Sequence, residues 1–112
     1  MAAPSNPTVE ARGMIVTVPE KKRLGDSTMT RFRMVTSDSR KNDDGTWEDV
    51  DTSFWTVEAW GKLGDKVADH LENKDYVIVR GKIKVRSFEH EGKQREAVEI
   101  KATSIGLDVE RA

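Results

Sequence analysis

The chain has 112 residues, enough for one small domain, with 36% hydrophobic and 35% charged residues. It contains no apolar run of the roughly 20 residues that a membrane span requires, and its first eight residues lack the pattern of a secretory signal. Cysteine is absent, which excludes disulfide frameworks, cysteine nucleophiles and thiolate zinc sites. We therefore expect a cytoplasmic protein.

The formal net charge of −1 argues against a nucleic-acid binder, because such domains usually carry a basic footprint. The charges are, however, segregated along the chain. Residues 80–88 contain four cations and no acid, whereas acids gather between 43 and 51. Such segregation can build a local electropositive surface on a protein that is neutral overall.

The N-terminal third of the chain predicts an arm, a strand and a loop. Residues 1–7 contain two prolines and predict a disordered arm. The β-branched stretch 14–18 predicts a strand that ends at Pro19. Residues 20–28 are mostly charged, include a Gly-Asp pair and predict a loop.

Residues 29–37 alternate as a half-buried strand does, with Phe32 and Met34 on the apolar face and Arg31 and Arg33 on the other. A long polar loop is then predicted for 39–52, a length that is typical of functional or mobile loops.

Residues 53–60 predict the third strand, with Phe54, Glu58 and Trp60 on one face and Trp55 on the other. We interpret Trp55 as a core or interface residue. Trp47, in the preceding loop, either stacks on a base or packs within the turn.

An apolar residue recurs every four positions in 62–72, which predicts a short amphipathic helix. In 76–85 aliphatic residues alternate with Arg and Lys, which predicts the fourth strand, and Phe88 continues its basic face. After a turn, 96–105 predict a last strand with Val98 and Ile100 inward.

Five strands with one helix between the third and fourth do not alternate as a parallel α/β sheet does. The order and the length instead predict an all-β, five-stranded OB-fold barrel over residues 8–107. Residues 108–112 would form a short C-terminal remnant.

Three aromatic residues, Phe54, Trp60 and Phe88, fall on faces that ought to be solvated, beside a basic row. Single-stranded nucleic acid explains this pattern, since bases stack on rings while cations contact phosphates; in known single-strand binders such stacking contributes roughly 1–3 kcal/mol per base. In the alternative interpretation the rings cover the open end of the barrel or a subunit interface, and the basic row is merely solvated.

Enzymatic sites find no support in the sequence. His70 lies on the solvent face of the predicted helix, and His90 at a hairpin tip has no second histidine at ligand spacing. There is no nucleophile triad and no phosphate-binding glycine loop. We expect a protein that is not an enzyme and needs no cofactor or metal.

Two segments, 54–63 (FWTVEAWGKL) and 79–88 (VRGKIKVRSF), carry a family likeness, and the second fits the pattern V-x-G-x-[LI]-x-x-R-x-[WF]. Together with Thr36-Ser37-Asp38-Ser39 they resemble the bacterial single-stranded DNA-binding proteins, over about residues 9–107.

The resemblance implies an OB fold, a homotetramer and sequence-tolerant binding of single-stranded DNA in replication, recombination or repair. It places Trp55 at a subunit interface. It implies stacking and phosphate-binding roles for Phe54, Trp60, Phe88, Lys62, Lys84, Arg86, Lys82, Arg33, Arg31 and Arg40. Arg40 stands where the family often has another aromatic residue.

Two features depart from the family pattern. The acidic C-terminal tip that recruits replication and repair partners is absent, which suggests a shortened form or a tail-less relative, so these partners are not carried over. Glu58 falls on the DNA face, so we expect a lower affinity than is usual. The remaining alternative is an OB-fold accessory module of the primosome type that binds RNA or a protein partner.

Overall fold

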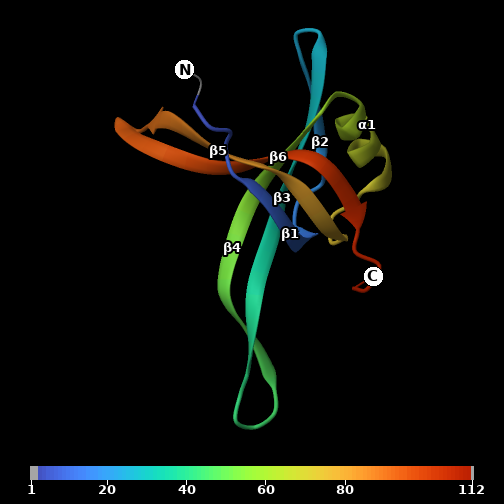
Figure 1. The fold of residues 1–112 in the computed structure, drawn as a ribbon, viewed down its shortest axis with the longest axis vertical. Coiled ribbons are helices and arrows are strands. Elements are labelled where there is room, and N and C mark those ends of the chain that lie inside the picture. The colour runs from blue at the N-terminus through green and yellow to red at the C-terminus, as the bar shows by residue number, and fades with distance from the viewer. Residues whose placement is uncertain (1–2, 112) are drawn as a thin grey trace.

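Residues 3–111, which the computed structural model describes, form six strands and one helix (Figure 1). The elements are β1 (Thr8–Ile15), β2 (Glu20–Leu24), β3 (Ser27–Lys41), β4 (Trp47–Trp60), α1 (Gly61–His70), β5 (Tyr76–His90) and β6 (Lys93–Leu107). The predicted all-β fold and its single helix between the central strands are confirmed. Within this described part of the chain, no helix is long and apolar enough to cross a membrane.

The strands form one curved sheet in the order β1-β5-β6-β4-β3-β2. Strand β1 also pairs with β3, through Met14–Val35 and Ile15–Met34, so the sheet curls back on itself as an OB fold does. Only β4 and β6 pair in parallel, and every other pairing in this part of the chain is antiparallel.

The core lies inside this curved sheet. Phe32 and Met34 of β3, Val57 of β4 and Val79 of β5 are buried there, and α1 contributes Val67. The alternation predicted for 29–37 is therefore confirmed. The helix predicted for 62–72 is confirmed as Gly61–His70.

The loop predicted for 20–28 is wrong, because residues 20–24 form β2 and pair with β3 over their whole length. All five residues of β2 are exposed, so the sequence has no apolar alternation to mark a strand. Nζ of Lys21 lies 2.9 Å from Oδ1 of Asp65 on α1, and this contact lowers the pKa of the Asp65 carboxyl. This ion pair connects the edge strand to the helix.

The polar loop predicted for 39–52 is also wrong, because β3 and β4 continue pairing as far as Lys41 and Trp47 and form a long arm (Figure 1). The amide of Asn42 donates to the carbonyl of Thr46 at 2.7 Å, and Gly45 takes a φ of +88° in the turn. Both faces of the arm are solvated, so most of its side chains are polar and its two apolar ones, Trp47 and Val50, do not alternate with them. Alternation could not reveal these strand ends.

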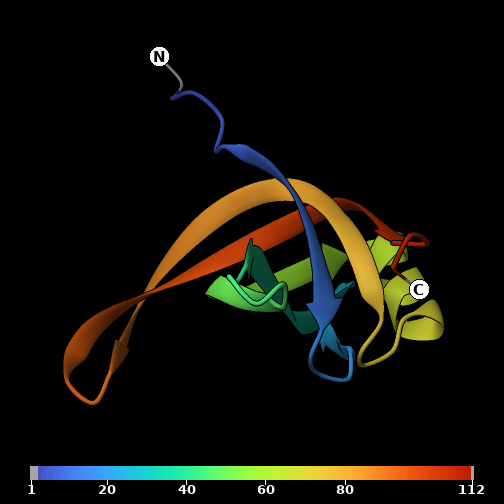
Figure 2. The ribbon, with the colours of Figure 1, turned by 90° about the horizontal axis from the view of Figure 1, so that it is seen from below.

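The hairpin of β5 and β6 extends beyond the core as a second arm (Figure 2). Val85 and Val98 face each other across this arm and are 55% and 44% exposed. The inward position predicted for Val98 is therefore wrong, because the arm has left the core at that point. Ile100, two residues later, is fully buried as expected.

The first strand also begins earlier than its apolar residues suggest. The strand predicted for 14–18 is observed at 8–15, where its backbone pairs with β5. Of the predicted disordered arm at 1–7, residues 1–2 lie outside the described residues. Residues 3–7 have no regular secondary structure, and the amide of Ile83 donates to the carbonyl of Pro7 at 2.9 Å.

Gly81 allows β5 and β6 to approach closely at an irregularity in their pairing. A Cβ atom at Gly81 would lie 2.2 Å from the carbonyl oxygen of Lys101 and 2.8 Å from Cα of Ala102, both backbone atoms. We expect Gly81→Ala to lower the free energy of unfolding by about 1–3 kcal/mol in urea titration, because the strands must separate. Gly106→Ala in β6 is the control, since a Cβ there meets no atom within 4 Å. Equal stability of the two variants would contradict this explanation.

Candidate nucleic-acid interface

The strand register aligns charged residues in rows across the outward side of the sheet. Arg31 of β3 is paired with Glu58 of β4, Glu58 with Lys101 of β6, and Lys101 with Lys82 of β5. The neighbouring row contains Arg33, Thr56, Glu99 and Lys84 in the same strand order. We call this side the outer face, defined by Arg31, Arg33, Phe54, Thr56, Glu58, Trp60, Lys82, Lys84, Arg86, Phe88, Glu99 and Lys101.

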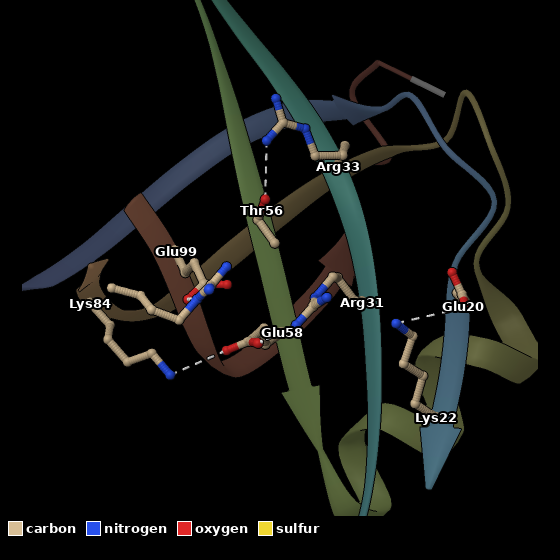
Figure 3. A network of polar contacts seen from close by, with 9 residues as sticks. Glu20, Lys22, Arg31, Arg33, Thr56, Glu58, Lys84 and Glu99 are labelled. Carbon is tan, nitrogen blue, oxygen red and sulfur yellow. Dashed lines mark hydrogen bonds and ion pairs between the residues drawn. The ribbon is translucent and has the colours of Figure 1, made fainter. Parts of the chain in front are cut away.

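Glu58 lies at the centre of the outer face but is only 4% exposed, which the sequence did not indicate. Its Oε2 accepts a hydrogen bond of 3.1 Å from Nη2 of Arg31, and its Oε1 lies 3.6 Å from Nζ of Lys84 (Figure 3). These contacts join β3, β4 and β5, and they compensate the cost of burying a carboxylate.

Glu99 is a second buried carboxylate, 2% exposed, whose Oε1 accepts a hydrogen bond of 3.3 Å from Nε of Arg86. Nη1 of Arg33 donates to Oγ1 of Thr56 at 3.0 Å (Figure 3). Sequence reasoning missed Glu99 because nothing local distinguishes it from a solvated glutamate. Only the pairing of β6 with both β4 and β5 reveals its burial.

Two aromatic rings on this side each lie beside an arginine. Phe54 is 56% exposed, and Cζ of Arg33 lies 5.8 Å from its ring centroid. Phe88 is half-buried on the β5–β6 arm, with Cζ of Arg86 at 5.1 Å. These are cation–π distances, and the guanidinium planes add flat surface beside the rings.

Trp60 is half-buried at the end of β4, directly before α1. Six residues of extended strand separate it from Phe54, or about 20 Å, so the rings are spread along a path rather than clustered. Lys62 follows in the first turn of α1 and is exposed.

Lys82 and Lys101 are both exposed and are directly opposite each other across β5 and β6. Neither forms an ion pair with any residue in 3–111, and two like charges in this position repel. An anion bound between them would remove the repulsion. Lys101 was missed by sequence reasoning, although extending the outward alternation of β6 from Glu99 would have found it.

Arg40 and Trp55 are placed away from the outer face. Arg40 pairs with Glu48 on the β3–β4 arm. The Trp55 indole packs against the core, and its Nε1 donates to Oγ1 of Thr36 at 3.0 Å. Its role at a subunit interface stays a prediction. The exposed Trp47 lies near the tip of the same arm.

The β3–β4 arm is acidic, with six carboxylates and two cations in residues 38–51. Hydrogen bonds from the hydroxyl and amide of Thr46 lower the pKa of Asp44 in its turn. Such a surface repels polyanions, whereas the cations of β5 attract them. Among residues 3–111 no group of three or more carboxylate or histidine side chains is arranged to hold a metal ion.

Comparison with known proteins agrees with this geometry. The model of the single-strand binding protein family matches residues 8–108. Single-stranded DNA-binding protein 1 of Streptomyces coelicolor is 34% identical over 102 residues, which is 90% of this chain and 65% of that protein. The single-stranded DNA-binding protein of Corynebacterium glutamicum is 34% identical over 97 residues, 84% of this chain and 43% of its own length. This chain thus spans less than two-thirds of these curated relatives.

A crystal structure of the small single-stranded DNA-binding protein from Streptomyces coelicolor superposes with a TM-score of 0.87 at 31% identity, covering 96% of this chain and 98% of that one. The second such protein from Mycobacterium smegmatis gives a TM-score of 0.72 at 28% identity, covering 96% and 94%. With the family match over nearly the whole chain, these likenesses show that the chain belongs to the single-strand binding protein family.

Proposed function

We propose that this chain binds single-stranded DNA without sequence preference, on the outer face. One observation carries the proposal. Lys82 and Lys101, which face each other without an ion-pair partner in the described part of the chain, lie on the same side of the sheet as two solvent-accessible rings, Phe54 and Phe88. Family membership and the names of the relatives support it.

Binding follows from two kinds of contact. Phosphates approach the cations of the outer face and displace counterions, which makes the affinity fall as salt rises. Bases stack on Phe54, Trp60 and Phe88, and every base has a π-face, so stacking tolerates any sequence. Lys62, Lys84, Arg86, Lys82, Arg33 and Arg31 are the proposed phosphate contacts. Arg40, bound to Glu48 on the acidic arm, is the least favoured of the residues predicted from the sequence.

The cellular role that we propose is protection of single-stranded DNA in replication, recombination or repair, in the cytoplasm, by a protein that is not an enzyme. A homotetramer is the proposed assembly, with Trp55 near a subunit interface. Sedimentation equilibrium tests this assembly, because a tetramer would have four times the 12.6 kDa mass of the chain.

Competition distinguishes this function from the alternative of an RNA- or protein-binding module. A fluorescently labelled oligo-dT complex is challenged with unlabelled single-stranded DNA, duplex DNA and RNA of equal length. We expect single-stranded DNA of any sequence to displace the label and duplex to fail. Displacement by RNA at a lower concentration than DNA, or no complex with oligo-dT, would favour the alternative.

Lys101 provides a test of the proposed phosphate path. We expect Lys101→Ala to weaken oligo-dT binding about 3- to 10-fold at low salt and to reduce the slope of log affinity against log salt by about 0.7, the value for one phosphate contact on a single strand. Fluorescence anisotropy at several salt concentrations measures both. Lys41→Ala, which removes an exposed lysine from the acidic β3–β4 arm, should bind as the unmodified chain does. An unchanged slope for Lys101→Ala would remove Lys101 from the path.

A further inference from the structure

Glu58 occupies a position on the outer face that a phosphate-binding surface would ordinarily give to a neutral or basic residue. Its register neighbours are Arg31 on β3 and Lys101 on β6, and the residue as a whole is 4% exposed. A buried carboxylate is costly unless cations surround it. Because Glu58 is buried, contact of its carboxylate with water cannot explain why an acid stands among the proposed DNA contacts.

The two cations that contact Glu58 remain accessible. The side chains of Arg31 and Lys84 are 38% and 42% exposed, while that of Glu58 is 5% exposed, so a buried carboxylate contacts two cations that reach solvent. Figure 3 shows these two cations on either side of Glu58. The contact between Lys84 and Glu58, at 3.6 Å, is an ion pair without a hydrogen bond, and Glu58 Oε1 has no hydrogen-bond partner among the described residues. The ammonium group is thus held in place electrostatically with its N–H donors uncommitted.

The charge balance of this cluster has a direct consequence for an anionic ligand. Arg31 and Lys84 carry two positive charges, and Glu58 cancels one of them at a distance of 3.1–3.6 Å. A phosphate at the cluster therefore interacts with one net positive charge, although two cationic groups are positioned to donate to it.

We propose that Glu58 is a positioning residue that holds Arg31 and Lys84 in place across three strands while it limits the affinity of the outer face for single-stranded DNA. This inference rests on the proposed function. The charge of Glu58 makes the complex with DNA weaker and faster to dissociate. It also means that DNA binding releases one counterion fewer than the number of cations on the outer face implies.

The test is the isosteric variant Glu58→Gln, with binding to oligo-dT measured by anisotropy at 50 and 200 mM salt. We expect the variant to bind about 3- to 10-fold more tightly at the lower salt, because the cluster gains one net charge. Its salt slope should be steeper by about 0.7, so its advantage should shrink about 2.5-fold at the higher salt. A purely structural role for Glu58 would not move this slope.

Glu110→Gln is the matched control, because it removes the same charge from a carboxylate that binds Arg12 at 3.2 Å in the C-terminal segment. We expect its affinity and slope to equal those of the unmodified chain. If Glu58→Gln melts below the assay temperature, Glu58→Thr repeats the measurement with a neutral residue of higher strand propensity, and the same increases are expected.

The outcomes separate this inference from the function on which it rests. If the unmodified chain does not bind oligo-dT at 50 mM salt, the proposed function itself is wrong. If it binds, and the neutral variants bind equally or more weakly with an unchanged slope, the function stands and the inference is overturned. An equal increase for Glu110→Gln would also overturn it, since the effect would then come from net charge alone.

Discussion

Trp60→Ala combined with Phe88→Ala is expected to lower the affinity for oligo-dT by about 2–6 kcal/mol, which is the cost of two stacking platforms at roughly 1–3 kcal/mol each. Both rings are half-buried at the periphery of the fold, on the last residue of β4 and on the β5–β6 arm, and neither belongs to the buried core. The barrel should therefore stay folded. Anisotropy with labelled oligo-dT measures the loss, and circular dichroism verifies the fold.

Trp47→Ala is the control for this experiment, because it removes an exposed indole from the acidic β3–β4 arm. We expect it to change the affinity much less than the double variant, since phosphates avoid the carboxylates around it. A folded Trp60/Phe88 variant that binds as well as the unmodified chain would contradict the assignment of these rings. A large loss for Trp47→Ala would place the DNA along the arm instead.

Phe32→Ala is expected to have the largest effect on stability, about 3–5 kcal/mol in the free energy of unfolding. Phe32 is 1% exposed on the inward side of β3, where it packs with Met34 and Val57. Since a small domain is stable by only about 5–15 kcal/mol, this loss is a large fraction of the total. Urea titration measures it.

Phe54→Ala is the matched control, because it removes the same ring from the opposite side of the sheet, where it is 56% exposed. We expect the free energy of unfolding of this variant to change by less than about 1 kcal/mol, whereas its affinity for DNA should fall. Phe32→Ala, in contrast, acts on stability. Equal destabilisation by the two substitutions would mean that the inward and outward sides of the sheet have been assigned wrongly.

The sequence could predict those strands that bury one face. Phe32 and Met34 alternate with Arg31 and Arg33, and this pattern alone assigned the two sides of β3 correctly. It could not predict β2, because a strand with both faces in water has no alternation. For the same reason the sequence predicts a loop where β3 and β4 form their arm, and it predicts strands that are too short where β5 and β6 form theirs.

The candidate site was predictable in its cations and rings but not in its carboxylates. Lys84 and Arg86 could be assigned to the outward side by counting along one strand. The burial of Glu58 and Glu99 depends on the parallel pairing of β4 with β6. These two strands lie far apart in the sequence, so no local pattern can predict their register. This is why part of a face that reads as a basic row is in fact a set of ion pairs, in which Arg31 and Lys84 contact Glu58 and Arg86 contacts Glu99.

The three tryptophans of the chain can report directly on whether single-stranded DNA binds to the outer face. Oligo-dT is titrated into the protein at two salt concentrations while the intrinsic fluorescence is followed. We predict strong quenching that saturates, because a base stacks on Trp60, and weaker binding at the higher salt, because phosphates displace counterions. No quenching and no binding at the lower salt would contradict binding of single-stranded DNA and favour a protein partner for the outer face.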